Sequence, residues 1–273
     1  MVSSIVRNPV VSGQFYPNSA NEIKKQLNSF IAAPGQIYEA IGCLMPHAGY
    51  IYSGKVATLT AASMHIKETV FLLGPNHTGY GSPFSIMAKG SWKTPMGDVE
   101  IDDAISNKLL ENCNLLTDDA SAHMFEHSLE VELPILQFFN KNFKIIPITM
   151  SSDDINELKK VGEAIAGCIK SSGAEQKSLI IASSDLTHYE DIDSARKKDN
   201  IAIDSILKLD ENGLMKNIKE YGISMCGYMP AITMISAAKL LNAKKTKLIS
   251  YTTSAENSGD ESSVVGYAGI VIY

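Results

Sequence analysis

Short runs of apolar residues alternate along the chain with segments whose apolar residues recur at helical spacing. Within each run the apolar positions are consecutive, which is typical of strands buried on both faces. The pattern therefore predicts strands in the core of a largely parallel sheet. These runs lie at Ile41–Met45, Thr69–Leu73, Lys144–Thr149, Ser178–Ala182 and Lys247–Tyr251.

Three segments between these runs have the periodicity of amphipathic helices. Asn18 or Ser19 could cap the first of them, and Gly173 is expected to stop the second. Pro230 is expected to open the third, because proline is tolerated at the first helical position. The predicted helices cover Asn21–Ala32, Asp153–Lys170 and Pro230 to about Leu241.

A further strand is predicted at Ser263–Ile272, where Gly266 and Gly269 suggest a bulge or bend. Strands that alternate with helices imply an α/β fold with a largely parallel central sheet and helices on both faces. No linker-like, repetitive or low-complexity tract interrupts the sequence, so we expect a single domain over residues 1–273.

The composition narrows the classes of protein to consider. Hydrophobic residues make up 45% and charged residues 20%, which is typical of a globular protein. A net charge of −6 argues against direct nucleic-acid binding and against binding to an anionic membrane. Neither a signal peptide nor a transmembrane run is recognisable. With four widely spaced cysteines and no CxxC pair, we expect a cytoplasmic protein with reduced thiols: Cys43, Cys113, Cys168 and Cys226.

Three histidines follow predicted strands within a few residues: His47, His77 and His188. In open parallel sheets, ligands bind at the carboxyl ends of strands, because the loops there converge. The three imidazoles could therefore form a metal site or an acid–base cluster. The alternative is that each one caps a strand by bonding a loop carbonyl.

Two further residues could belong to the same site. Asp185 lies three residues before His188, and it could bind a metal, orient an imidazole or bond backbone amides. Cys226 lies just before a predicted helix, whose dipole would favour the thiolate if the thiol points toward it. The alternative for Cys226 is a small buried hydrophobe.

His123 and His127 have i, i+4 spacing, which on a helix would place both imidazoles on one face. Glu126 does not stand directly after His123, where a zinc-protease HExxH motif requires its glutamate, so that chemistry is not indicated. Either histidine, together with Glu126, could line the crevice around the main site. No GxSxG elbow or phosphate-binding loop is present.

Several sequence blocks occur in a fixed order over almost the whole chain. They are Pro46–Tyr50, Leu73–His77, Glu126–Pro134, Ser184–His188 and Cys226–Pro230, with Ser12–Pro17 and Ser263–Tyr267 near the ends. Taken together and in this order, the blocks resemble those of the Memo family, in the form of the microbial branch described as protein B of the AmmeMemoRadiSam system.

The resemblance implies a fold similar to class III extradiol dioxygenases of the LigB type, which hold non-haem Fe(II) by two histidines and a carboxylate. Carried over, His47 and His77 match the ligand histidines and His188 matches the acid–base histidine. Cys226 falls where the carboxylate ligand is expected. Because a thiolate is a softer, oxidisable ligand, this difference puts dioxygenase activity in doubt.

Two main hypotheses follow. The first is a metal-dependent redox or oxygenase-like enzyme, with iron expected and copper or zinc as alternatives, in which Asp185 orients His188. The second is a non-catalytic adaptor that uses a vestigial pocket to bind a peptide or partner protein. A zinc hydrolase with the same ligands is a third. The resemblance also implies association with radical-SAM and AMMECR1-like proteins.

Overall fold

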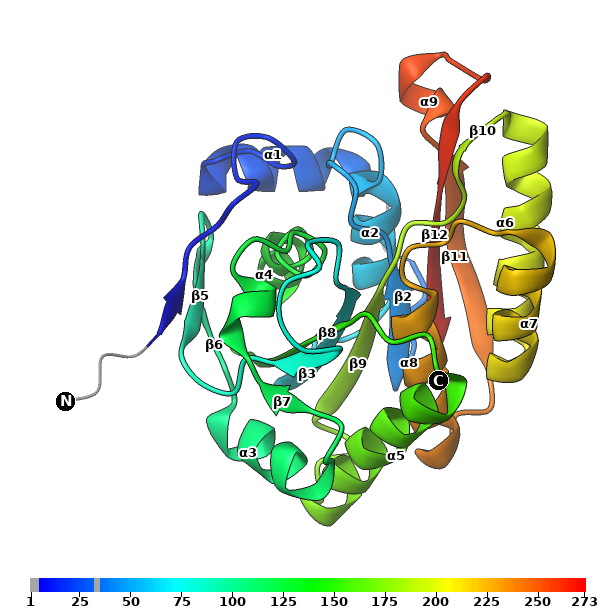
Figure 1. Ribbon diagram of the computed structural model, residues 1–273. Coiled ribbons are helices and arrows are strands. Elements are labelled where there is room, and N and C mark those ends of the chain that lie inside the picture. The colour runs from blue at the N-terminus through cyan, green and yellow to red at the C-terminus, as the bar shows by residue number, and fades with distance from the viewer. Residues whose placement is uncertain (1–4, 32–34) are drawn as a thin grey trace.

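The computed structural model describes residues 5–31 and 35–273. Its strands form a large central sheet and a small three-stranded sheet (Figure 1). The strands of the large sheet are β2 (Gly42–Met45), β3 (Thr69–Pro75), β4 (Phe84–Ile86), β7 (Thr117–Asp118), β8 (Lys144–Met150), β9 (Ser178–Ser183), β10 (His188–Glu190), β11 (Thr246–Thr253) and β12 (Val264–Ile272). The small sheet contains β1 (Val6–Arg7), β5 (Ser91–Thr94) and β6 (Gly97–Glu100).

The large sheet has the order β10-β12-β2-β9-β3-β8-β4-β7, and β11 also pairs with β12. Its four central strands, β2, β9, β3 and β8, are parallel. On one side β12 is antiparallel to β2, and on the other β4 is antiparallel to β8. The expected α/β fold with a largely parallel central sheet is confirmed. The antiparallel flanks were not predicted.

Helices cover both faces of this sheet because its strands are apolar on both sides. In β2, the side chain of Leu44 packs into one apolar cluster, whereas Cys43 and Met45 pack into another. The first face carries α3 (Asp103–Asn112), α5 (Ile155–Ser171), α6 (Ile192–Leu207), α7 (Glu211–Tyr221) and α8 (Tyr228–Leu240). The second carries α1 (Ala20–Phe30), α2 (Gly54–Ala62) and α4 (Leu133–Phe139), together with the small sheet (Figure 1).

The five predicted apolar runs correspond to β2, β3, β8, β9 and β11, although Ile41 lies just before β2. The first four are the buried parallel strands that we expected, whereas β11 is half-buried and antiparallel to β12. The strand predicted at 263–272 is β12, and a register irregularity lies opposite one of its two glycines. In the pairing of β11 with β12, the register shifts between Leu248 and Ser250, opposite Gly269. The additional residue is on β11, so the bulge belongs to the partner strand.

The predicted helices correspond to α1, α5 and α8, with shifts at their ends. Ser19 is the N-cap of α1, and its side chain accepts a hydrogen bond from the amide of Glu22. The helix ends at Phe30, and the predicted end at Ala32 lies outside the described residues. Gly173 has a φ of +60° just beyond α5, as expected for a stop. Helix α8 begins at Tyr228, two residues before Pro230. Proline is tolerated there because the amides of the first helical turn have no partner within the helix, so the missing N–H of Pro230 costs no hydrogen bond.

All four cysteines are free thiols. Cys43, Cys113 and Cys168 are buried in the apolar clusters, as expected of structural residues. Within the described ranges, every helix is too short or too polar to cross a membrane.

Candidate metal centre

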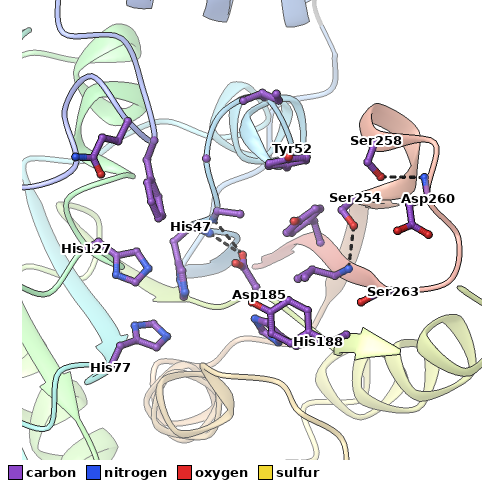
Figure 2. A pocket seen from close by; sticks show the side chains of 18 residues that line it. His47, Tyr52, His77, His127, Asp185, His188, Ser254, Ser258, Asp260 and Ser263 are labelled. Carbon is purple, nitrogen blue, oxygen red and sulfur yellow. Dashed lines mark hydrogen bonds between the residues drawn. The ribbon is translucent and has the colours of Figure 1, made fainter. Parts of the chain in front are cut away.

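Three neighbouring parallel strands deliver the central residues of the site. Strand β9 lies between β2 and β3, and all three end at the same edge of the sheet. The loop after β2 carries His47, the loop after β9 carries Asp185 and the loop after β3 carries His77. Figure 2 shows these three side chains around one pocket.

His47, His77 and Cys226 bring three donor atoms together, all within 4.8 Å of one another. Nε2 of His47 lies 3.4 Å from Sγ of Cys226. The ring centroids of the two histidines are 5.3 Å apart. Two imidazoles and one thiol at this separation form a donor set suited to a transition metal.

Hydrogen bonds fix which nitrogen of His47 is free. The Ser183 hydroxyl donates to the carbonyl oxygen of Ser128 over 2.8 Å. The hydroxyl has only this one proton to donate. Its oxygen lies 2.8 Å from Nδ1 of His47, so it must accept a hydrogen bond from Nδ1–H. Nε2 is then unprotonated and faces Cys226. Burial, followed by the nearby His77 and His127, lowers the pKa of His47 well below its usual value and keeps the ring neutral.

A carboxylate fixes the tautomer of His77 in the same way. Nδ1 of His77 lies 2.9 Å from Oε1 of Glu126, which also accepts the amide of Ser128. Burial alone would raise the pKa of Glu126, but the contact with His77 and the amide hydrogen bond lower it to about 2. The ionised carboxylate therefore accepts Nδ1–H and leaves Nε2 for a metal.

His188 adopts the same tautomer. Its Nδ1 donates to the carbonyl oxygen of Ser224 over 2.9 Å, and its amide donates to the hydroxyl of that serine. Ser224 therefore takes the orienting role that we expected of Asp185. All three strand-end histidines have Nδ1 engaged with an oxygen atom, and Nε2 of His47 faces the thiol of Cys226.

Asp185 contacts the backbone of the first histidine loop. Its Oδ1 accepts the amide of His47 over 2.9 Å and the amide of Ala48 over 3.3 Å. Of the three roles considered from sequence, this geometry matches the bonding of loop amides. Burial raises the pKa of Asp185 to about 6, although the hydrogen bond from His47 opposes this shift.

Cys226 is positioned by the start of α8. Gly227, the next residue, packs so closely on the end of β9 that a Cβ there would overlap Ser183 and Ser184. Burial, followed by the charge of Asp185, raises the pKa of the Cys226 thiol. Burial thus outweighs the preference for thiolate that the helix dipole would give. A bound metal would itself displace the proton.

The structure separates His127 from His123. The ring of His127 stacks on that of His77, with centroids 4.8 Å apart and an interplanar angle of 22°, and it lines the pocket. His123 lies outside the pocket, buried with Nε2 3.1 Å from the Ser85 carbonyl oxygen. The two do not share a helical face, because a short 3-10 helix ends at His123. Of the two histidines that could line the crevice, His127 is among the described lining residues and His123 is not.

A buried charge network that we did not predict holds this segment in place. The guanidinium of Arg7 pairs with Glu130 and donates to the carbonyl oxygens of His123 and Glu126 over 3.1 and 2.6 Å. Glu130 also accepts from the hydroxyl of Tyr16 over 2.6 Å. A sequence signal does exist: Glu126, Glu130 and Glu132 are closely spaced carboxylates in an otherwise apolar segment. The arginine that matches them is too distant in the chain to be found from spacing.

The pocket beside the donor atoms has a volume of about 610 Å³ (Figure 2). This is large enough for an organic molecule with many more atoms than dioxygen or water. Figure 2 places His47, His77 and His127 on one side of the pocket and Ser254, Ser258 and Asp260 on the other.

Glu126 makes stability depend on pH. Its folded pKa of about 2 lies below the ordinary value of 4.5, so its contribution is complete above pH 4.5 and is lost as the pH falls toward 2. We expect the free energy of unfolding to fall over this range, and to fall less in Glu126→Gln. Urea denaturation at stepwise pH measures this, with the exposed Glu111→Gln as control. A slope as steep in Glu126→Gln as in the wild type would contradict it.

Fold and site together define an α/β protein with a candidate metal centre of two histidines and a cysteine at the carboxyl edge of its sheet. The family described as "Memo-like protein" matches residues 7–271, so the chain belongs to the Memo family. Among curated relatives, a "MEMO1 family protein" of Methanopyrus kandleri is 41% identical, covering 97% of this chain and 98% of its own. Another from Methanosarcina acetivorans is 42% identical, covering 98% and 99%.

Proposed function

We propose that this protein is a metal-dependent redox enzyme of the oxygenase-like kind, with iron held by His47, His77 and Cys226. The observation that carries the proposal is the arrangement of three donor atoms within 4.8 Å. The Nδ1–H groups of both histidines are engaged elsewhere, which directs each Nε2 to the metal. Partners that orient ligand histidines in this way are typical of metal sites.

The donor set suits iron, with copper and zinc as the metals to be distinguished from it. Imidazole binds all three, and thiolate favours the softer ones. Fe(II) bound here would supply a redox-active Lewis acid whose remaining coordination positions are open to a substrate and dioxygen.

The residues around the donors support the handling of a substrate and its proton. His188 lines the pocket, and its tautomer leaves Nε2 able to accept a proton from a substrate hydroxyl. Asp185 holds the backbone of the His47 loop. The stack of His127 on His77 limits the rotation of the ligand ring.

The test is metal content after anaerobic loading with Fe(II). We expect about one iron per chain in the wild type and at least tenfold less in His47→Ala, because a ligand has been removed. His65→Ala is the matched control, since His65 is exposed and away from the pocket. Circular dichroism checks that each variant is folded.

Three other results would decide against the proposal. Equal iron content in His47→Ala and the wild type would show that iron is not bound at the assigned site. Exclusive retention of zinc would favour the hydrolase hypothesis. Stoichiometric iron without metal-dependent redox turnover would favour the adaptor hypothesis, in which the pocket only binds.

A further inference from the structure

The part of the pocket beyond the metal ligands is lined by three tyrosines, Tyr52, Tyr189 and Tyr267, which we call the tyrosine wall. They come from the loop after β2, from β10 and from β12. Tyr267 is buried, and burial, followed by the charge of Asp185, raises the pKa of its hydroxyl. Three phenol rings from distant parts of the chain therefore gather at one place.

The backbone of Tyr189 is in a conformation that residues with a side chain rarely adopt. Its φ is +60°, in the left-handed region that disfavours side chains. It is the additional residue in a register shift between His188 and Glu190, where β10 pairs with β12. Its side chain is 78% exposed, so core packing does not compensate for the strain. Bulges of this kind redirect side chains beside functional sites.

The charges along the pocket have one sign. Among its described lining residues, Asp185 and Asp260 carry carboxyl groups, and none is lysine or arginine. Oδ1 of Asp260 accepts both recorded hydrogen bonds, from the amide and hydroxyl of Ser262, which leaves Oδ2 for a ligand. On the adjoining elements, Lys55 and Lys198 are paired with Glu256 and Glu190, and Arg196 lines a neighbouring pocket together with Glu256 and Glu261.

We propose that the tyrosine wall and Asp260 bind an organic ammonium group, so that the substrate of this protein is an amine. The faces of phenol rings attract ammonium ions, and a carboxylate without a competing lysine or arginine adds to that attraction. At the tyrosine wall, an anionic head group would meet the carboxylate of Asp260 and no lysine or arginine among the described lining residues. Tyr189 lies beside His188, with ring centroids 5.7 Å apart. The rest of a bound amine thus extends toward the histidines.

That the bound amine is a substrate rests on the proposed metal centre. Binding of the amine can be tested without that centre. The probes are tyramine, 4-ethylphenol and 4-hydroxyphenylacetate, which have similar shapes and carry a positive, no and a negative charge on the side chain. Affinities are measured by calorimetry on the protein as purified and again after treatment with a chelator. We expect tyramine to bind at least about tenfold tighter than either of the others in both preparations.

Variants identify the residues responsible. Tyr189→Leu should reduce the preference for tyramine over 4-ethylphenol about threefold or more, and Tyr189→Phe, which keeps the ring, should preserve it. Asp260→Asn should also reduce the preference, whereas Asp98→Asn on the exposed face of β6 should not. Both target residues are exposed, so these changes should leave the fold intact.

Equal affinity for tyramine and 4-ethylphenol, or tighter binding of the anion, would overturn the inference. So would an unchanged preference in both Tyr189→Leu and Asp260→Asn. If the protein binds no iron but still prefers tyramine, the proposed metal function fails and the ammonium site stands. If iron is bound at His47 and the preference is absent, the reverse holds.

Discussion

Replacing Arg7 by alanine is expected to lower the free energy of unfolding by about 3–5 kcal/mol, as measured by urea denaturation. Arg7 and Glu130 are both fully buried. Removing the guanidinium leaves a carboxylate in the interior with one partner fewer, and removes donors from two buried carbonyl oxygens. It also removes a cation from the face of Trp92, 4.4 Å from the ring centroid.

The matched control for Arg7→Ala is Lys55→Ala. Lys55 and Glu256 form an ion pair whose side chains are 54% and 51% exposed, so solvent screens it. The control should change the free energy of unfolding by less than about 1 kcal/mol. A similar small change in Arg7→Ala would show that the buried pair is not needed to hold the Glu126–Glu130 segment.

Replacing Gly227 by alanine is expected to damage the metal centre through backbone packing alone. The φ of Gly227 is −101°, which alanine can adopt, so backbone strain plays no part. The added Cβ would overlap the carbonyl oxygen of Ser183, which belongs to the central sheet and cannot move cheaply. Helix α8 must then shift and carry Cys226 away from His47. We expect a destabilisation of about 1–3 kcal/mol and at least tenfold weaker metal binding.

Gly167→Ala provides the matched control for Gly227→Ala. Gly167 is exposed in the interior of α5, and a Cβ there would meet nothing within 4 Å. Alanine at that position should stabilise the protein by about 0.5–1 kcal/mol and leave metal content unchanged. If Gly227→Ala behaves like this control, the close approach to Ser183 does not set the position of Cys226.

The central strands could be predicted from the sequence because both of their faces are buried. Consecutive apolar residues identify such strands, as in β3 and β9. Strands β7 and β10 have two and three residues and are partly exposed, so no apolar run marks them. The antiparallel flanks depend on pairings between distant segments, which local pattern does not encode.

The approach of His47 and His77 could be expected because the ends of parallel strands converge. Which ring nitrogen of each histidine carries the proton could not be predicted, since the partners Ser183 and Glu126 come from other segments. The different positions of His127 and His123 could not be predicted from the sequence either. It depends on a 3-10 helix that ends four residues before His127, and spacing alone does not locate that end. The roles assigned to these residues stay predictions.

The position of β12 affects when this protein can fold during its synthesis. Residues 264–272 pair with β2, β10 and β11, and β2 and β11 both pair with residues 270–272 from opposite edges, so this strand fills an interior position of the large sheet. Until the ribosome has released it, β2 has an unpaired edge and the tyrosine wall lacks Tyr267. The sheet can therefore be completed only after residues 264–272 have left the ribosome, and until then β2 presents an open strand edge to which another chain or a chaperone can bind.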